Sequence, residues 1–236
     1  MINNTIIEIC IGNVKDGIIA SNYPIDRLEL NCALELGGLS PSLETLKYLK
    51  ERIDTKICCM VRPRGGDFCY TQEEYEVMLK DARNMLQNGA DGIVFGFLKE
   101  NNTIDIERTL KMSELIHSYN AEAVFHKAFD EIEDLDDATQ TLINCHIDRI
   151  LTSGKAVYPD ILKGCEIIND LNNRYGDKIQ FLPGGGVRTD NIRDVLKVSG
   201  VHQIHMTSKK TNEGNYLQFD EEQLQKMLEE IKKIVT

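Results

Sequence analysis

The sequence lacks the features that would direct a chain to a membrane or to nucleic acid. Its 236 residues contain no run of about eighteen apolar residues, and the opening segment MINNTIIEIC does not resemble a signal peptide. The formal charge is -11, and no segment concentrates lysine and arginine among aromatic residues. A basic surface is what attracts nucleic acid or anionic lipid. We therefore predict a soluble, cytoplasmic protein that binds neither nucleic acid nor a membrane.

The chain also lacks paired cysteines and a linker. Its seven cysteines include no C-x-x-C pair, which argues against a disulfide framework and against a structural zinc site. Reduced thiols are expected, and most of these cysteines are interpreted as small buried apolar residues. No stretch rich in proline, glycine or serine divides the sequence. We predict a single domain over residues 1–236 and leave homo-oligomerisation open.

Short apolar runs alternate with longer segments of helical spacing along the whole chain. One of the helical segments begins at Thr71, the N-cap of a capping box that Glu74 completes three residues later. Eight βα units in this length favour a single-domain TIM-type (β/α)8 barrel, and a doubly wound open sheet is the alternative. The eight predicted strands are residues 6–11, 27–31, 56–61, 92–95, 121–126, 149–151, 179–182 and 203–206.

The carboxyl ends of the predicted strands are polar, and barrels build their sites at these ends. By the period of two along a strand, Glu8 and Cys10 share one face of the first strand. Glu29 and Asn31 share one face of the second strand in the same way. We predict a single cleft to which every strand contributes. The later strands add Arg62, Arg64, Phe95, Gly96, His126, Asp130, Thr152, Ser153, Gly154, Gly184, Gly185, Gly186, His205 and Ser208.

The segment RPRGGDF brings two guanidinium groups close together just before Asp67. Like charges repel, so an anion is expected between Arg62 and Arg64. Glu8 and Glu29 lie within apolar strands and need cationic or hydrogen-bonding partners. We therefore expect these glutamates to pair with the two arginines. Two interpretations stay open: a structural ion-pair network, or a clamp for a small anionic ligand that also includes Asp67.

His126 is the candidate general acid or base. It follows the fifth strand, and histidine titrates near neutral pH. The neighbouring Lys127 and Asp130 would orient its ring. His205, on the eighth strand, has the same status. A hydrogen-bonded structural histidine is the alternative interpretation for both.

The segment LPGGGVRTDNI predicts a strand, a glycine turn and a helix capped by Thr189. Free backbone N–H groups at Gly184, Gly185 and Gly186 would hold an oxyanion or a phosphate. Barrels often bind phosphate between the loops that follow strands seven and eight. The eighth loop, MTSKK, contains Ser208. An ordinary tight strand-to-helix connection is the alternative.

Eight short motifs together resemble the CutC family over nearly the whole chain. They are EIC, RLEL, LGGLSPS, MVRPRGGDFCYT, GADGIVFG, FHKAFD, RILTSG and PGGGV. The resemblance implies a TIM-type barrel, a cytosolic location and a role in copper homeostasis, with copper(I) binding proposed for some members. Cys10 matches a family cysteine. Asn31 stands where copper-binding members have a second cysteine, and Cys32 follows one residue later, which on a strand is the opposite face.

Three functional hypotheses follow. The first is a copper(I) buffer or carrier that binds the metal through Cys10 with His126 or Cys32. The second is an enzyme of unassigned reaction on a small anionic metabolite. In that enzyme His126 is the acid or base, Glu8 and Glu29 orient groups or transfer protons, and the arginines and glycines hold the anion. The third is a barrel that binds a metabolite or a partner without turnover.

Overall fold

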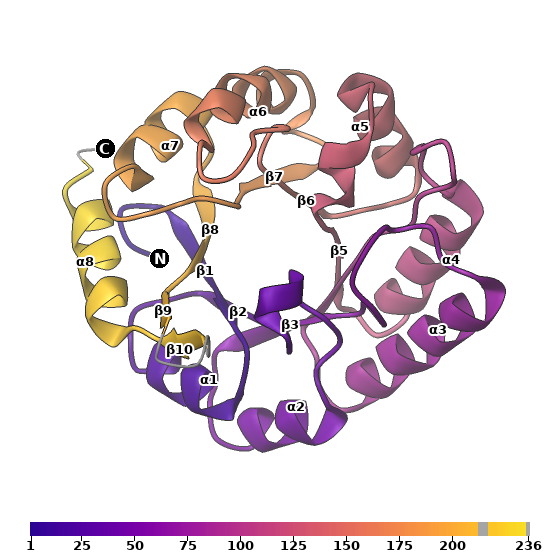
Figure 1. Ribbon diagram of the computed structural model, residues 1–236, viewed down its shortest axis with the longest axis horizontal. Coiled ribbons are helices and arrows are strands. Elements are labelled where there is room, and N and C mark those ends of the chain that lie inside the picture. Colours follow the sequence, from indigo (N-terminus) through magenta and orange to yellow (C-terminus); the bar gives the residue numbers. More distant parts are fainter. Residues whose placement is uncertain (212–216, 235–236) are drawn as a thin grey trace.

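Eight parallel strands form a central ring enclosed by helices, which confirms the predicted barrel (Figure 1). The computed structural model describes residues 1–211 and 217–234. The barrel strands are β1 (Ile6–Ile11), β2 (Arg27–Leu30), β3 (Lys56–Met60), β4 (Gly92–Phe95), β5 (Glu122–Phe125), β6 (Arg149–Thr152), β7 (Gln180–Pro183) and β8 (Gln203–Thr207). The α-helices are α1 (Val14–Ser21), α2 (Leu43–Lys50), α3 (Gln72–Gln87), α4 (Ile106–His117), α5 (Leu135–Asn144), α6 (Leu162–Tyr175), α7 (Ile192–Ser199) and α8 (Glu221–Lys232).

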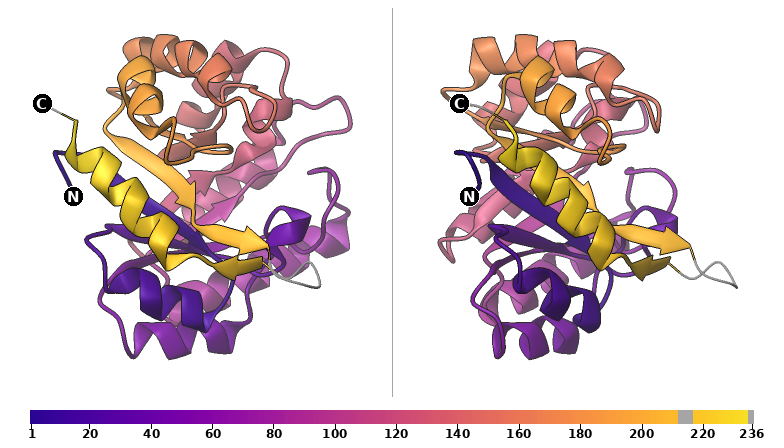
Figure 2. Two further views of the ribbon diagram at one scale, coloured as in Figure 1. Left: turned by 60° about the vertical axis from the view of Figure 1, so that its left-hand side comes forward. Right: turned by 90° about the vertical axis from the view of Figure 1, so that its left-hand side faces the viewer.

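The order of the strands excludes the doubly wound alternative. β1 pairs in parallel with both β2 and β8, so the first and last barrel strands are neighbours. The barrel closes between β7 and β8, where Nε2 of Gln203 donates to the carbonyl oxygen of Phe181 at 3.0 Å. After β8, a hairpin of β9 (Lys209–Thr211) and β10 (Leu217–Phe219) extends beyond the carboxyl ends of the strands (Figure 2).

The helices cover the ring with apolar faces. α3 begins with the predicted capping box: Oγ1 of Thr71 accepts from the N–H of Glu74, and the Glu74 carboxylate accepts from the N–H of Thr71. Its buried side chains join one cluster with outward-facing strand residues such as Ile7 and Ile9. None of the helices in the described ranges is long and apolar enough to cross a membrane.

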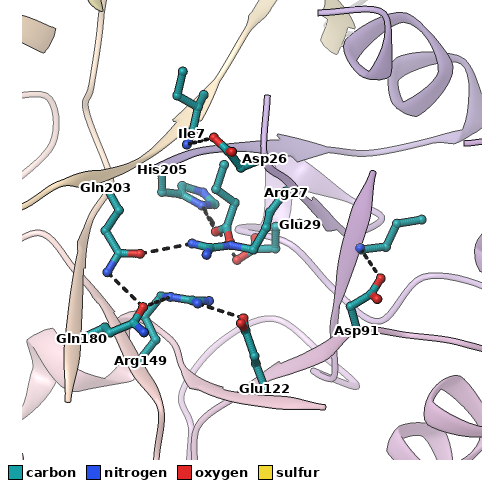
Figure 3. A network of polar contacts seen from close by, with 12 residues as sticks. Ile7, Asp26, Arg27, Glu29, Asp91, Glu122, Arg149, Gln180, Gln203 and His205 are labelled. Carbon is teal, nitrogen blue, oxygen red and sulfur yellow. Dashed lines mark hydrogen bonds and ion pairs between the residues drawn. The ribbon is translucent and has the colours of Figure 1, made fainter. Parts of the chain in front are cut away.

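The interior of the barrel is filled by a polar network rather than by branched apolar layers alone (Figure 3). Arg27 donates through Nε to Glu8 Oε2 at 2.8 Å and through Nη2 to Gln203 Oε1 at 3.2 Å. On the other side of the ring, Nη2 of Arg149 donates to Glu122 Oε2 at 2.8 Å. Gln180 accepts from Arg149 and Gln203 and so links the two ion pairs.

Each arginine of this network is buried with a carboxylate of its own. Arg27 is 4% exposed and Arg149 is 1% exposed, so neither charge is solvated by bulk water. An isolated buried charge costs several kcal/mol, and a hydrogen-bonded partner offsets much of that cost. The pairs therefore make the network tolerable, and they fix the position of Glu8 below the carboxyl ends of the strands.

We predict that Arg27→Met destabilises the fold by about 3–5 kcal/mol, because it leaves the Glu8 carboxylate buried beside an apolar side chain. Arg174→Met is the matched control. Arg174 forms exposed ion pairs with Asp136 and Asp170, and since exposed pairs are weak, its loss should cost about 1 kcal/mol or less. Urea unfolding followed by circular dichroism measures both changes. Equal losses in the two variants would show that the buried pair contributes no more than a surface pair.

Candidate functional site

A cavity of about 340 Å³ opens at the carboxyl end of the barrel. Its floor is formed by inward-facing strand residues, and its walls come from the loops that follow the strands. Of the candidates predicted from the sequence, the cavity brings together Cys10, Glu29, Asn31, Arg62, His126, Gly185, Gly186 and His205. The predicted cleft at this end is present, but the prediction that every strand contributes to it is wrong. Phe95 and Gly96, at the end of β4, are not among the described lining residues, and Gly96 packs against the ring of His126.

A thiol, a carboxylate and an imidazole meet at the floor of this cavity. One ligand atom each from Cys10, Glu29 and His205 lies within 4.8 Å of the other two, and all three residues are buried. The strand register explains the cluster. Cys10 is level with Glu29 on the adjacent β2, and His205 on β8 is level with Glu8, one inward position below Cys10. Figure 3 shows His205 and Glu29 directed toward the same region.

Glu8 holds the imidazole of this cluster from below. Its Oε1 lies 2.8 Å from Nδ1 of His205, while its Oε2 accepts from Arg27. Burial by itself would raise the pKa of Glu8, but the hydrogen bond with His205 and the charge of Arg27 lower it below its ordinary value. Glu8 is therefore an anion that orients the His205 ring through Nδ1, and Nε2 is the ring nitrogen that Glu8 does not engage.

The protonation states of the cluster follow from its burial. Burial raises the pKa of the Cys10 thiol, although a hydrogen bond with His205 opposes this. Burial also raises the pKa of Glu29. For His205, burial would lower the pKa, but the charge of Glu29 and the hydrogen bonds to Cys10 and Glu8 raise it well above its ordinary value. At neutral pH the cluster holds a thiol and an imidazolium.

Asn31 completes the cluster at the position of the second family cysteine. Its Nδ2 donates to Glu29 Oε1 at 2.8 Å and contacts Cys10 Sγ at 3.4 Å. A side chain at Gly38 is excluded, since its Cβ would lie 2.4 Å from Asn31 Oδ1. Cys32 is directed elsewhere and donates to the carbonyl of Ser40 at 3.0 Å. The expected opposite orientation of the Asn31 and Cys32 side chains is confirmed.

The expected pairing of Arg62 with Glu8 or Glu29 is wrong. Arg27 and His205 take the place beside Glu8, because β2 and β8 are the hydrogen-bonded neighbours of β1. Arg62 lies higher, against the cavity, and binds backbone oxygens of its own and a neighbouring loop. Nη1 donates at 3.1 and 3.2 Å, Nη2 at 2.9 Å, and the acceptors are the carbonyls of Leu36, Gly38 and Gly66.

Arg64 was also expected to pair with Glu8 or Glu29, and this too is wrong. Its Nε donates to Glu74 Oε1 at 2.6 Å, and Nη2 donates to Asp67 Oδ1 at 3.1 Å. The side chain is 35% exposed, and neither Arg64 nor Asp67 is among the described residues that line the cavity. Arg64 instead joins the β3–α3 loop to the first turn of α3.

His126 lines the cavity as a buried neutral ring. Its Nδ1 accepts from the backbone N–H of Ala128 at 3.1 Å, and its ring packs 4.7 Å from that of Phe68 between centroids. Burial and the positive charge of Arg62 lower the pKa of His126 to about 3. Because Nδ1 is an acceptor, the proton of the neutral ring lies on Nε2. His126 thus presents a donor.

Asp130 and Ser153 lie together beside the cavity and bind each other. Asp130 accepts from the hydroxyl of Thr152, from the N–H and hydroxyl of Ser153, and from the N–H of Lys155. These bonds tie the short helix after β5 to the loop after β6. Neither Asp130 nor Ser153 is among the described lining residues.

The remaining predicted residues lie in the loops after β7 and β8. Gly184 packs beneath the rim, where a Cβ would meet Leu151 and His205. Ser208 lies at the base of the hairpin and donates to the carbonyl of Asp220. The predicted Thr189 cap is wrong. Helix α7 begins at Ile192, and the Asn191 side chain instead accepts from the N–H of Arg188 and donates to the carbonyl of Gly186.

Sequence reasoning missed Arg27, the residue that neutralises Glu8. The signal was present, because Arg27 and Glu29 alternate in RLEL and must face the same side of a strand. What the sequence does not give is the register that sets Arg27 level with Glu8 across β1 and β2. Gln203 and Arg149, which complete the network, were missed for the same reason.

The fold and this cluster define a TIM-type barrel with a thiol, an imidazole and a carboxylate buried below the opening at the carboxyl end of its strands. The chain belongs to the CutC family, whose model matches residues 5–210. A CutC protein of Treponema denticola is 41% identical over 89% of this chain and 84% of its own length. The human copper homeostasis protein cutC homolog is 36% identical over 90% of this chain and 76% of its own length.

Solved structures agree with this assignment. The crystal structure of a copper homeostasis protein CutC from Streptococcus agalactiae matches with a TM-score of 0.77 and 31% identity, over 85% of this chain and 97% of that chain. A phosphoribosylanthranilate isomerase from Pyrococcus furiosus matches with a TM-score of 0.58 and 13% identity, over 98% of this chain and all of that one. The second likeness shows the fold alone.

We predict that the pKa values of the two buried histidines are shifted in opposite directions, that of His126 downward and that of His205 upward. His126 should stay neutral and His205 charged from pH 5 to pH 8, near the ordinary pKa of about 6.5. Because the folded pKa of His126 lies below the unfolded one, its contribution to stability is lost as the pH falls from about 6.5, by about 1 kcal/mol per pH unit. The contribution of His205 is complete below about 6.5 and is lost only as the pH rises through its raised pKa.

Nitrogen-15 chemical shifts of the ring atoms measure both states directly. A midpoint near pH 6.5 for His126 would show that its ring is hydrated in solution. It would also contradict the assignment of the ring proton to Nε2, which rests on the hydrogen bond from Ala128 to Nδ1.

Proposed function

We propose that this protein binds copper(I) as a cargo ion through Cys10 and His205, with Glu29 beside them. The single observation that supports the proposal is the buried cluster of these three side chains in a member of the CutC family. A thiolate and an imidazole are ligands that suit this soft ion. The proposal extends to this chain what the name of the human relative says of that protein.

Two features of the cluster support a metal. Oε2 of Glu29 is buried without a hydrogen-bond partner among the described residues. It lies 4.0 Å from Nδ1 of His205, too far for a hydrogen bond, so a bound cation would satisfy it. His205 is held at Nδ1 by the Glu8 carboxylate, the arrangement in which ligating histidines usually occur. The unpaired oxygen of Glu29 favours a bound cation, and Nε2 of His205 is the ring nitrogen that Glu8 does not engage.

The partner of Cys10 in this proposal differs from those expected from the sequence. His126 has its proton on Nε2, and its Nδ1 accepts from Ala128, so neither nitrogen is prepared to bind a metal. Cys32 is engaged with Ser40. We therefore assign the second ligand to His205. The free state of all seven cysteines suits the reducing cytosol, where we place the protein.

We predict that Cys10→Ser removes stoichiometric copper(I) binding. Glu8→Gln should weaken binding by about 10–100-fold, because it loosens the orientation of His205 without removing a ligand. Cys32→Ser and Cys69→Ser are the matched controls and should bind as the native protein does. A competition titration against a copper(I) chelator under anaerobic, reducing conditions measures all four. Zn²⁺ titrated in parallel tests the choice of metal, since zinc bound more tightly than copper(I) would contradict it.

We predict that copper(I) affinity rises with pH. The metal needs a thiolate and a neutral imidazole, whereas the pKa values of Cys10 and His205 are both raised, so binding must release their protons. Each released proton should strengthen binding by about tenfold per pH unit below the raised pKa values. Titrations at pH 6, 7 and 8 in a chelator of known proton stoichiometry provide the slope. An affinity independent of pH would exclude this ligand pair.

A further inference from the structure

The cavity above the cluster of Cys10, Glu29 and His205 is lined mainly by positive charges, although the formal charge of the protein is -11. Four permanent cations line it: Arg62, Lys127, Arg188 and Lys209. Among the described lining residues the only carboxylate is Glu29, so the cations outnumber the carboxylates. A cleft lined by one sign of charge concentrates ions of the other sign. The cavity is therefore suited to an anion that is distinct from the metal.

Arg62 carries a buried charge that no carboxylate neutralises in the described part of the chain. The residue is 6% exposed, and its hydrogen-bond acceptors are neutral carbonyl oxygens. Its Nε has no acceptor among the described residues. Phe68 covers the guanidinium at 5.0 Å from the ring centroid. A buried cation without a counterion is unfavourable, so an anion bound in the cavity would stabilise it.

His126 adds a second unpaired donor on the same wall. Its Nε2 carries the ring proton and is buried without a partner among the described residues. The ring of His126 and the guanidinium of Arg62 both contact Phe68, and the Arg62 charge acts on the His126 pKa. Two neighbouring N–H donors without acceptors fit the two oxygens of a carboxylate.

The glycine loop after β7 offers a separate set of donors across the cavity. The backbone N–H groups of Gly185, Gly186 and Val187 have no acceptor within the described ranges. Gly185 has a φ of +91°, and a Cβ there would lie 2.8 Å from Nζ of Lys127, so the ammonium lies directly over the loop. Backbone donors with a lysine beside them, at the β7–β8 end of a barrel, match the usual phosphate site.

We propose that the cavity binds a small organic molecule with two anionic groups, a phosphate at the Gly185–Val187 loop and a carboxylate at Arg62 and His126. The volume of about 340 Å³ lies at the lower end of the range for small-molecule sites, so it admits a short phosphorylated acid. Apolar side chains such as Met60 and Leu151 also line the cavity and suit the carbon skeleton of such a molecule. The proposal does not require copper(I) and applies to the metal-free protein.

Three probes that differ by one group each test this on the native protein. They are 3-phosphoglycerate, glycerol 3-phosphate, which lacks the carboxylate, and glycerate, which lacks the phosphate. Isothermal titration calorimetry on the metal-free protein at pH 7 measures their affinities. We expect 3-phosphoglycerate to bind at least about tenfold more tightly than either single-anion probe, because each added group makes charge-assisted hydrogen bonds. Equal affinities for the three probes, or no binding of any, would overturn the proposal.

Two variants then distinguish the proposed carboxylate site from the proposed phosphate site. Arg62→Met should reduce the affinity for 3-phosphoglycerate to that for glycerol 3-phosphate and leave the latter unchanged. Lys127→Gln should weaken both phosphorylated probes by the same factor and leave glycerate unchanged. Lys111→Gln, on the exposed face of α4, is the control and should change nothing.

If Arg62→Met does not fold, Lys127→Gln and the native comparison still decide the question, since Lys127 is a partly exposed residue. Loss of glycerate binding in Lys127→Gln would contradict the assignment of the two ends. Inorganic phosphate binding as tightly as 3-phosphoglycerate would show an unselective anion site and would also overturn the proposal.

Discussion

The rest of the structure depends on one carboxylate that serves two cations. Glu8 accepts from Arg27 through one oxygen and contacts His205 through the other, each at 2.8 Å. This is feasible because β2 and β8 both place a cation level with Glu8. A slip of one residue on either side would turn a charged side chain into the apolar layer between strands and helices. The register of the first, second and last barrel strands and the geometry of the site are therefore specified by the same contacts.

The buried arginines of the barrel lie at two levels, and only those at the lower level are paired with carboxylates. In the network below the cavity, Arg27 and Arg149 each have a carboxylate, and Gln180 and Gln203 accept further hydrogen bonds from the two guanidinium groups. Around the cavity, Arg62 has only carbonyl oxygens as acceptors among the described residues. Of the two interpretations left open for the arginine-rich segment, the structural one holds for Arg64, which pairs with Glu74 and Asp67. The buried ion-pair network lies lower in the barrel, and Arg27 and Arg149 form it.

Much of the fold could be predicted from periodicity, and less of the site. The eight strands and the capping box at Thr71 follow from local patterns, and so does the shared face of Glu8 and Cys10. Which side chains meet across strands depends on register and on the shape of loops, and neither is written in local sequence. Arg62 turns to carbonyls of two glycine-containing loops, and Asn191 displaces the expected Thr189 cap by closing its own loop.

The two proposed occupants of the barrel influence each other through charge. Without metal, the cluster holds a neutral Cys10 thiol and a positive His205 imidazolium. Copper(I) replaces their two protons with one positive charge on a thiolate and a neutral imidazole, so the net charge of the cluster falls by one unit. The floor of the cavity then loses a positive charge close to the anion. Within this low-dielectric site the loss weakens attraction for the anion, and by linkage a bound anion weakens copper(I) binding to the same degree. A barrel built in this way would release its metal more readily when the organic anion is abundant.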